Sequence, residues 1–283
     1  MAHSVVHPEA APPGANDWSC RPTADKPHPV ILLHGTFLNA YVGAAGMAPA
    51  LRDAGYCVFA PTYGADADPL IGAAPGVNAI GDIRESSRQV GAFVERVRAA
   101  TGAERVDLVG HSQGALVSRH YVTLGGGAEK VRTLVSLAGS FHGTTLGGIA
   151  VLGRRLQELG WPNGDSTSLV AGTAARQQLA GSDLLAELDA HGDTVPGVRY
   201  AALATRYDEV VNPYESQFIA PGPGAEVHNV TLQDGCEQDL SEHGSVIYNR
   251  RALHLVRQVL GDPAAAGPAP CEPTLIVAQL PPG

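Results

Sequence analysis

The sequence predicts an α/β fold with a mostly parallel central sheet flanked by helices. Short apolar segments alternate with longer amphipathic ones, which is typical of β-α-β units, whose strands run parallel. A Gly-x-Ser-x-Gly pattern at 110–114 directly follows one of the apolar segments and precedes a stretch typical of a helix. A chain of 283 residues can bury a large core, and we expect a single domain over 1–283.

The elements can be predicted in chain order. Residues 1–28 are rich in Pro and Ala and are expected to form an irregular arm that Cys20 ties down. Strands are predicted from short apolar runs at 29–33, 57–60, 106–109, 131–137, 198–204 and 227–232. Helices are predicted at 44–54, at 82–100, from 115 onward, and at 245–260.

Residues 146–195 differ from the rest of the chain. They contain apolar helical pieces at 146–159 and 174–190, separated by Gly, Pro and Asn, with no strand pattern. In an open α/β sheet, ligands bind beyond the carboxyl ends of the strands. We therefore expect 146–195 to form a helical excursion, or cap, over that edge.

Composition excludes several classes of partner. The formal net charge is −9 and there are only two lysines, which argues against nucleic acid or an anionic membrane as partner. No apolar run approaches the roughly 20 residues needed to span a bilayer, so no integral membrane association is expected. The first residues resemble the start of a mature chain, so we expect a secreted, extracellular protein whose signal peptide has been removed.

The four cysteines favour disulfides over a metal site. Cys20, Cys57, Cys236 and Cys271 include no C-x-x-C pair and no neighbouring cluster of histidines. Pairing along the chain predicts Cys20–Cys57 and Cys236–Cys271, which close two loops of similar length. Four reduced cysteines in the core are the alternative.

Ser112 is the strongest candidate for a catalytic residue. A serine in a tight strand-to-helix turn is presented as a nucleophile, and this turn needs residues without Cβ at the places of Gly110 and Gly114. A chance match is the alternative in a chain with 34 glycines, but the flanking strand and helix argue against it.

A serine nucleophile needs a base, and the base needs a carboxylate that fixes its tautomer. Asp208 lies just beyond the strand at 198–204, and Glu209 is its nearest competitor. Of 11 histidines, His243 alone follows the last strand and precedes a helix. We therefore predict Ser112, Asp208 and His243 as a catalytic triad, with His34 and His111 as packing groups beside it.

Acyl transfer also needs N–H donors for the negative charge that develops on the substrate carbonyl oxygen. The residue after the nucleophile, Gln113, is expected to supply one donor. The loop after the first strand is expected to supply the other, through Thr36.

These motifs resemble those of the secreted α/β-hydrolase lipases of the bacterial class 2 type and of fungal lipases of the Candida antarctica lipase B type. The resemblance covers most of 18–271 and is carried by 112–114, 143–146, 208–211 and 243–245. It implies an α/β-hydrolase fold and an oxyanion hole from Thr36, through backbone and hydroxyl, and Gln113. Cysteine pairs around the first turn and the histidine loop also occur in that family.

The expected function is that of a serine carboxylic-ester hydrolase, a lipase or esterase that needs no cofactor and no metal and acts as a monomer. A small-molecule or lipid ester, at a lipid–water or polymer interface, is the expected substrate. A cutinase-like polyester depolymerase or an acyltransferase would share the same triad; a non-catalytic binding protein is disfavoured by the intact triad. The residues expected to line the acyl pocket are Phe37, Leu146, Ile149, Val151 and Leu152.

Overall fold

A computed structural model describes residues 7, 10–66, 76–145, 147–149, 151 and 172–274. Six parallel strands form one sheet in the order β2-β1-β3-β4-β5-β6. In chain order the strands are β1 (Val30–Leu33), β2 (Val58–Phe59), β3 (Val106–His111), β4 (Val131–Leu137), β5 (Arg199–Ala204) and β6 (Glu226–Thr231). The predicted parallel α/β sheet is therefore confirmed.

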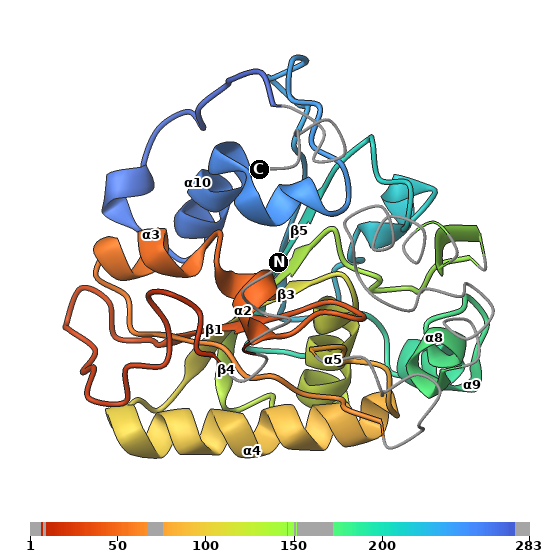
Figure 1. The fold of residues 1–283 in the computed structure, drawn as a ribbon, viewed down its shortest axis with the longest axis horizontal. Coiled ribbons are helices and arrows are strands. Elements are labelled where there is room, and N and C mark those ends of the chain that lie inside the picture. Colours follow the sequence, from red (N-terminus) through yellow and green to blue (C-terminus); the bar gives the residue numbers. More distant parts are fainter. Residues whose placement is uncertain are drawn as a thin grey trace.

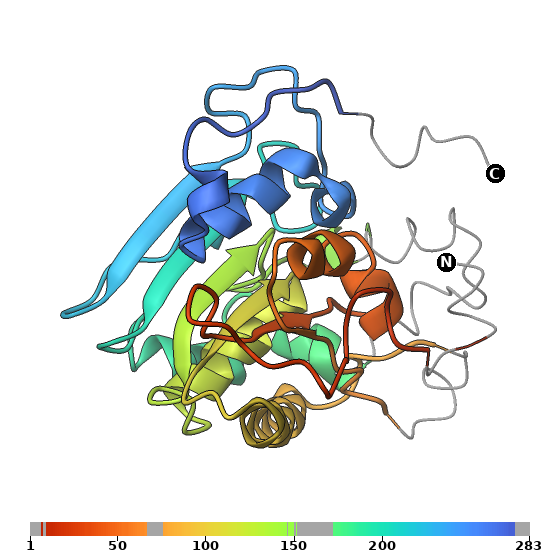
Figure 2. The same ribbon diagram turned by 90° about the vertical axis from the view of Figure 1, so that its left-hand side faces the viewer.

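Helices cover both faces of this sheet (Figures 1 and 2). The described α-helices are α2 (Ala40–Ala44), α3 (Ala48–Asp53), α4 (Ile83–Thr101), α5 (Gln113–Thr123), α8 (Thr173–Gln177), α9 (Asp183–Asp189) and α10 (Arg250–Val259). Side chains alternate along β1, so Ile31 packs with α4 and α5 while Leu32 packs with α3 and α10. Two apolar layers thus enclose the sheet.

The order of the strands reverses at the centre of the sheet. The chain runs from β1 outward to β2 and then returns to β3 on the other side of β1. Ligands bind at such a reversal because the loops after the two strands leave in opposite directions. Leu33, the last residue of β1, is paired with Gly110 near the end of β3. The loops that follow these strands therefore begin side by side.

Two predicted helices differ in the structure. In place of the helix predicted at 44–54, α2 ends at Ala44 and α3 covers only 48–53. Between them, Gly46 lies so close to another segment that a Cβ would come within 2.4 Å of the Ile247 carbonyl oxygen. The helix predicted at 245–260 is a 3-10 turn, η2 (Ser245–Tyr248), followed by α10. Asn249 separates them because its side chain accepts the Ala252 N–H and caps α10.

The arm and the excursion are described in part. The Cys20–Cys57 disulfide ties the arm to the residue before β2, and Trp18 packs on Phe59. In the excursion, α9 lies within the helical piece predicted at 174–190, and α8 begins one residue before that piece. Most of the piece predicted at 146–159 lies outside the described residues.

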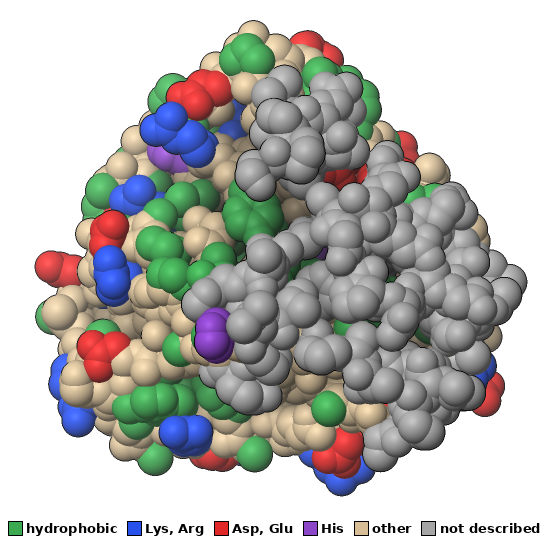
Figure 3. All heavy atoms as spheres, in the orientation of Figure 1, with side chains coloured by type: hydrophobic (Ala, Val, Ile, Leu, Met, Phe, Trp, Pro, Cys, Tyr) green, Lys and Arg blue, Asp and Glu red, His purple; other side chains and the backbone are tan. Residues whose placement is uncertain are grey.

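No helix in the described ranges is both long enough and apolar enough to cross a membrane. On the face shown in Figure 3, Lys and Arg side chains lie dispersed among Asp and Glu rather than gathered in one patch.

Candidate active site

Ser112 occupies the turn between β3 and α5, with φ 54° and ψ −122°. The strained conformation belongs to a tight turn, in which neighbouring backbone segments come close to the residues on both sides of Ser112. A Cβ on Gly110 would lie 2.4 Å from the Gly114 carbonyl carbon, and a Cβ on Gly114 would lie 2.5 Å from the Leu33 carbonyl oxygen. The two glycines therefore let α5 start directly against the end of β1.

The three residues predicted as a triad lie in one hydrogen-bonded row. The Ser112 hydroxyl donates to His243 Nε2 at 3.0 Å, and His243 Nδ1–H donates to Asp208 Oδ2 at 2.9 Å. Asp208 follows β5, and His243 ends the loop after β6. An isolated bridge between Tyr207 and Glu242 holds these two loops together one residue before each group. All three side chains are buried.

Hydrogen-bond donors other than His243 also hold the Asp208 carboxylate. Its Oδ1 accepts the backbone N–H groups of Val210 and Val211, at 2.9 and 2.7 Å. Its Oδ2 also accepts the side-chain amide of Gln217, at 2.9 Å. Contacts that do not involve the imidazole therefore fix the position of the Asp208 carboxylate.

The Oε2 atom of Glu209, the competing acid, accepts the backbone N–H of His243 at 3.4 Å. Burial raises the pKa of the Glu209 carboxyl. For His243, burial acts to lower the pKa, but the charge and hydrogen bond of Asp208, together with the charges of Glu209 and Glu242, raise the pKa above its ordinary value. Asp208 thus binds the imidazole ring directly and contributes to the raised pKa of His243.

The two residues expected to form the oxyanion hole follow two neighbouring strands: Thr36 follows β1, and Gln113 follows β3. Within the described ranges, no acceptor binds the backbone N–H of Thr36 or of Gln113. The Thr36 hydroxyl oxygen accepts two side-chain amides, from Gln113 and Gln178, each at 3.0 Å. The Thr36 hydroxyl also donates to Gln178 Oε1 at 3.3 Å, so the Gln178 amide meets this hydroxyl through both its nitrogen and its oxygen.

Two glutamines in this network were not predicted from the sequence. Gln178, just after α8, also accepts the Ser140 hydroxyl at 3.2 Å and so connects the excursion to the loop after β4. Gln217 lies in the 3-10 turn η1 (Tyr214–Gln217). Both lie in short elements without a strong hydrophobic period, so the sequence carries no signal for them.

His34 and His111 are buried beside the site, as expected for packing groups. The Nδ1–H of His34 donates to Gly35, its Nε2 accepts the Tyr63 N–H, and burial lowers its pKa to about 4. Burial, together with the nearby His243, lowers the pKa of His111 to about 3. Its Nε2–H donates to the His243 backbone carbonyl at 2.9 Å. Both rings are therefore neutral near pH 7.

His142 is in a different environment. Its two ring nitrogens face two acceptors, the Ser216 carbonyl at 2.7 Å and the Asp193 carboxylate at 2.9 Å. Both contacts can be hydrogen bonds only when the ring carries two protons. Burial acts to lower the pKa of His142, but the hydrogen bond to Asp193 and the one to Ser216 raise it overall.

The residues expected to line an acyl pocket are only partly described. Phe37 is buried in a small apolar cluster with Leu38, Val42 and Ile80. Ile149 is buried and Val151 is half-buried, whereas Leu146 and Leu152 lie outside the described residues. The pocket assignment stays a prediction.

Both predicted disulfides are present. Cys20 pairs with Cys57 and Cys236 pairs with Cys271, and the described residues contain no free cysteine. The second bridge closes the segment that contains His243.

A parallel sheet with a serine at the strand-to-helix turn after β3 defines the α/β-hydrolase class. Within it, residues 27–251 match the model of the lipase (class 2) family, and the chain belongs to that family.

Individual relatives are more distant. The triacylglycerol lipase of Pseudomonas fragi is 32% identical over 123 residues, which make up 42% of this chain and 36% of that protein. The crystal structure of Aspergillus fumigatus lipase B is similar with a TM-score of 0.65 at 20% identity, over 91% of this chain and 61% of that one. The mature Bacillus licheniformis lipase BlEst2 gives a TM-score of 0.56 at 16% identity, over 85% and 94%. The likeness to these two structures concerns the fold.

Proposed function

We propose that the chain is a serine carboxylic-ester hydrolase of the lipase or esterase type, which works through an acyl-enzyme on Ser112. The observation that carries the proposal is the row of hydrogen bonds from the Ser112 hydroxyl to His243, at 3.0 Å, and from His243 to Asp208, at 2.9 Å. A nucleophile, a base and an acid in this arrangement constitute the machinery for acyl transfer.

In the proposed reaction, Ser112 Oγ attacks the ester carbonyl carbon while His243 Nε2 takes the hydroxyl proton. The imidazolium that results is stabilised by the Asp208 carboxylate. His243 then returns the proton to the leaving alcohol, and the acyl group remains on Ser112. A water molecule, deprotonated by His243, releases the acid and regenerates the serine.

The negative charge on the carbonyl oxygen would be stabilised by the N–H groups of Thr36 and Gln113 and by the Thr36 hydroxyl. Gln178 and the Gln113 side chain support this role, since their amides donate to the hydroxyl oxygen and hold the Thr36 side chain in place. Removing one such donor typically costs about 10²–10³-fold in kcat.

An apolar ester is the substrate class that we favour. The described residues include three exposed large hydrophobic side chains, Tyr207, Leu240 and Tyr248. Tyr207 precedes the acid, and the other two lie within five residues of His243. Apolar side chains exposed around a site are typical of a surface that meets apolar ligands or interfaces. The curated relative is named a triacylglycerol lipase.

We also propose that the protein is secreted and extracellular and that it folds as one domain. Two disulfides support an oxidising compartment, because disulfides are rare in reducing cytosol.

The test combines labelling and turnover. Wild-type protein, Ser112→Ala and Ser118→Ala are treated with a fluorophosphonate and assayed on p-nitrophenyl esters from acetate to palmitate and on emulsified triglyceride. Ser118 is a matched control because it is a buried serine on the same helix, whose hydroxyl donates to the Gly114 carbonyl. We expect Ser112→Ala alone to lose labelling and several orders of magnitude of turnover. Labelling or turnover of Ser112→Ala near the wild-type level would refute the proposal.

A further inference from the structure

A second buried carboxylate lies in the loop that carries His243. Asp239 is 1% exposed, and no cationic side chain in the described ranges pairs with it. A buried carboxylate without a counter-charge is costly unless several hydrogen bonds compensate it. The groups that donate hydrogen bonds to Asp239 therefore indicate the role of this buried carboxylate.

Its donors come from three segments of the chain. The Ser241 backbone N–H and hydroxyl donate to Oδ1 at 2.9 and 2.6 Å. The Thr274 hydroxyl donates to Oδ1 at 3.0 Å, and the Asn249 side-chain amide donates to Oδ2 at 3.0 Å. Asp239 thus joins the histidine loop to the start of α10 and to the C-terminal segment.

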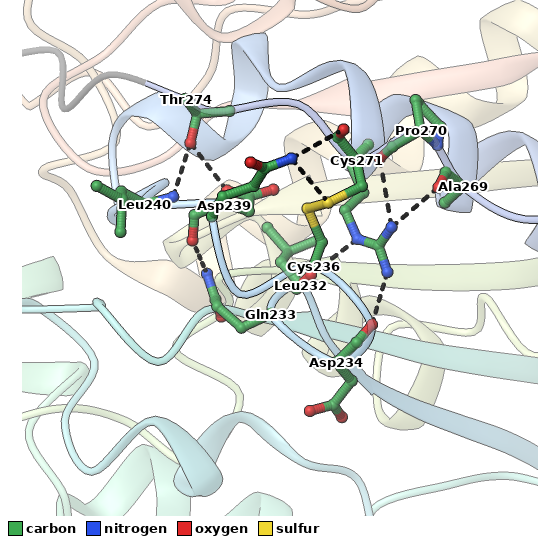
Figure 4. Close-up of a disulfide and its surroundings, with 12 residues drawn as sticks. Leu232, Gln233, Asp234, Cys236, Asp239, Leu240, Ala269, Pro270, Cys271 and Thr274 are labelled. Atoms are coloured by element: carbon green, nitrogen blue, oxygen red, sulfur yellow. Dashed lines mark hydrogen bonds between the residues drawn. A yellow bond between two sulfur atoms is a disulfide. The ribbon is translucent and has the colours of Figure 1, made fainter.

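Figure 4 shows this junction beside the Cys236–Cys271 disulfide. The Thr274 hydroxyl donates to Asp239 and also accepts the Leu240 N–H at 2.8 Å. The C-terminal segment is therefore hydrogen-bonded to two successive residues of the histidine loop. The Asp239 carbonyl accepts the Gln233 side-chain amide at 3.0 Å. The disulfide therefore holds the C-terminal segment at a position where the Thr274 hydroxyl can donate to Asp239.

The same network reaches the loop that carries the acid. Gln233 also donates to the Thr205 hydroxyl at 3.0 Å, and that hydroxyl donates to the Ser241 carbonyl at 2.5 Å. Thr205 follows β5, three residues before Asp208, and Ser241 precedes His243 by two residues. Hydrogen bonds centred on Asp239 consequently set the distance between the backbones that bear the acid and the base.

We propose that Asp239 is a positioning residue for His243. It fixes the loop so that the imidazole meets Ser112 and Asp208 at hydrogen-bonding distance, and it does so without touching the imidazole or the substrate. This inference rests on the proposed function of Ser112, Asp208 and His243.

The decisive substitution is Asp239→Asn, alone and together with Asn249→Asp. In the single variant the new amide faces the Asn249 amide, so two buried donors oppose each other. In the double variant the pair is reversed: the amide at 239 donates to the carboxylate at 249, whose other oxygen still accepts the Ala252 N–H. Ser241 and Thr274 keep an acceptor at 239 in both variants.

We expect Asp239→Asn to lower kcat by about 10–100-fold with KM within about twofold, because a small misplacement of a catalytic group acts on the chemical step. The double variant should recover kcat to within about threefold of wild type, as coupled neighbours do in a double-mutant cycle. The matched control is Asp262→Asn, which alters another buried aspartate, one that pairs with Lys26 and Arg257. It should lower the melting temperature without changing kcat.

Rates are measured at a temperature where circular dichroism shows each variant folded. The inference is overturned if Asp239→Asn keeps more than half of the wild-type kcat, if its loss equals that of Asp262→Asn, or if the double variant fails to recover. Should Asp239→Asn not fold, Thr274→Val decides: it keeps the shape of the side chain but removes the hydroxyl that donates to Asp239 and accepts the Leu240 N–H, and an unchanged kcat overturns the inference. A Ser112→Ala variant with wild-type turnover would instead refute the proposed function, so the two failures are distinguishable.

Discussion

Replacing Asp208 by Asn tests how the acid acts, because the environment of the carboxylate dictates how the new amide must lie. The Val210 and Val211 N–H groups both donate to Oδ1, so the amide oxygen has to take that place. The NH₂ group then takes the place of Oδ2, facing His243. Gln217 can turn to present its carbonyl oxygen, which has no partner among the described residues. The opposite orientation would set three N–H groups against each other.

Facing an NH₂ group, the imidazole is stable only with its proton on Nε2, where it can no longer accept the proton of Ser112. Restoring the productive tautomer leaves two buried donors unsatisfied, at roughly 1–3 kcal/mol each. Loss of the negative charge beside the imidazolium adds to that cost. At about 1.4 kcal/mol per tenfold, we expect Asp208→Asn to lower kcat by about 10³–10⁴-fold.

The matched control is Glu209→Gln. The Glu209 carboxylate accepts the His243 backbone N–H at 3.4 Å, a contact that a glutamine oxygen can also make, so we expect a change of less than about threefold. Both variants are assayed for kcat/KM on a soluble p-nitrophenyl ester across pH.

The pH profile gives a second readout with a definite sign. Asp208 raises the pKa of His243, and the base must be neutral to act, so wild-type kcat/KM should rise through a value above the ordinary 6.5 or so. In Asp208→Asn this limb should move to lower pH. A larger loss in Glu209→Gln than in Asp208→Asn, or an unmoved limb, would refute the assignment.

Two further predictions concern the surroundings of the site. Ile149→Ala should shift the ratio of kcat/KM between short and long acyl esters by about tenfold, if Ile149 lines the acyl pocket; an unchanged chain-length profile with a lower melting temperature would mean that it is core. The raised pKa of His142 means that its contacts with Asp193 and Ser216 stabilise the fold below the unfolded pKa, near 6.5, and that this stability is lost as pH rises through the folded pKa. The melting temperature of His142→Gln should therefore fall below wild type at about pH 5 by more than at about pH 9, and an equal gap at both would contradict the account.

The sheet could be predicted from local patterns. The strand at 131–137 is observed as β4 with the same ends, since a run that is apolar apart from Arg132, Thr133 and Ser136 leads there into small residues. The serine turn is also local, because its two glycines and flanking elements lie within a few positions of Ser112. The acid and the base could be proposed only from their order after later strands.

What the sequence did not predict depends on partners far along the chain. The break at Asn249 interrupts a well-formed apolar period: its side-chain oxygen caps α10, and its amide is held by a carboxylate ten residues earlier. Gln217 holds Asp208 from nine residues away, and Gln178 reaches Thr36 across 142. Periodicity describes which face of an element is buried, but it holds no information on which polar side chain finds which partner.

The strand order also has a consequence for folding. Thr36, Ser112 and Asp208 follow β1, β3 and β5, and the base follows β6 at the edge of the sheet. Parallel strands pair across long stretches of chain, which makes such sheets slow to assemble. On the proposed function, His243 reaches Ser112 only once β6 has joined the sheet, so catalytic competence depends on the complete sheet.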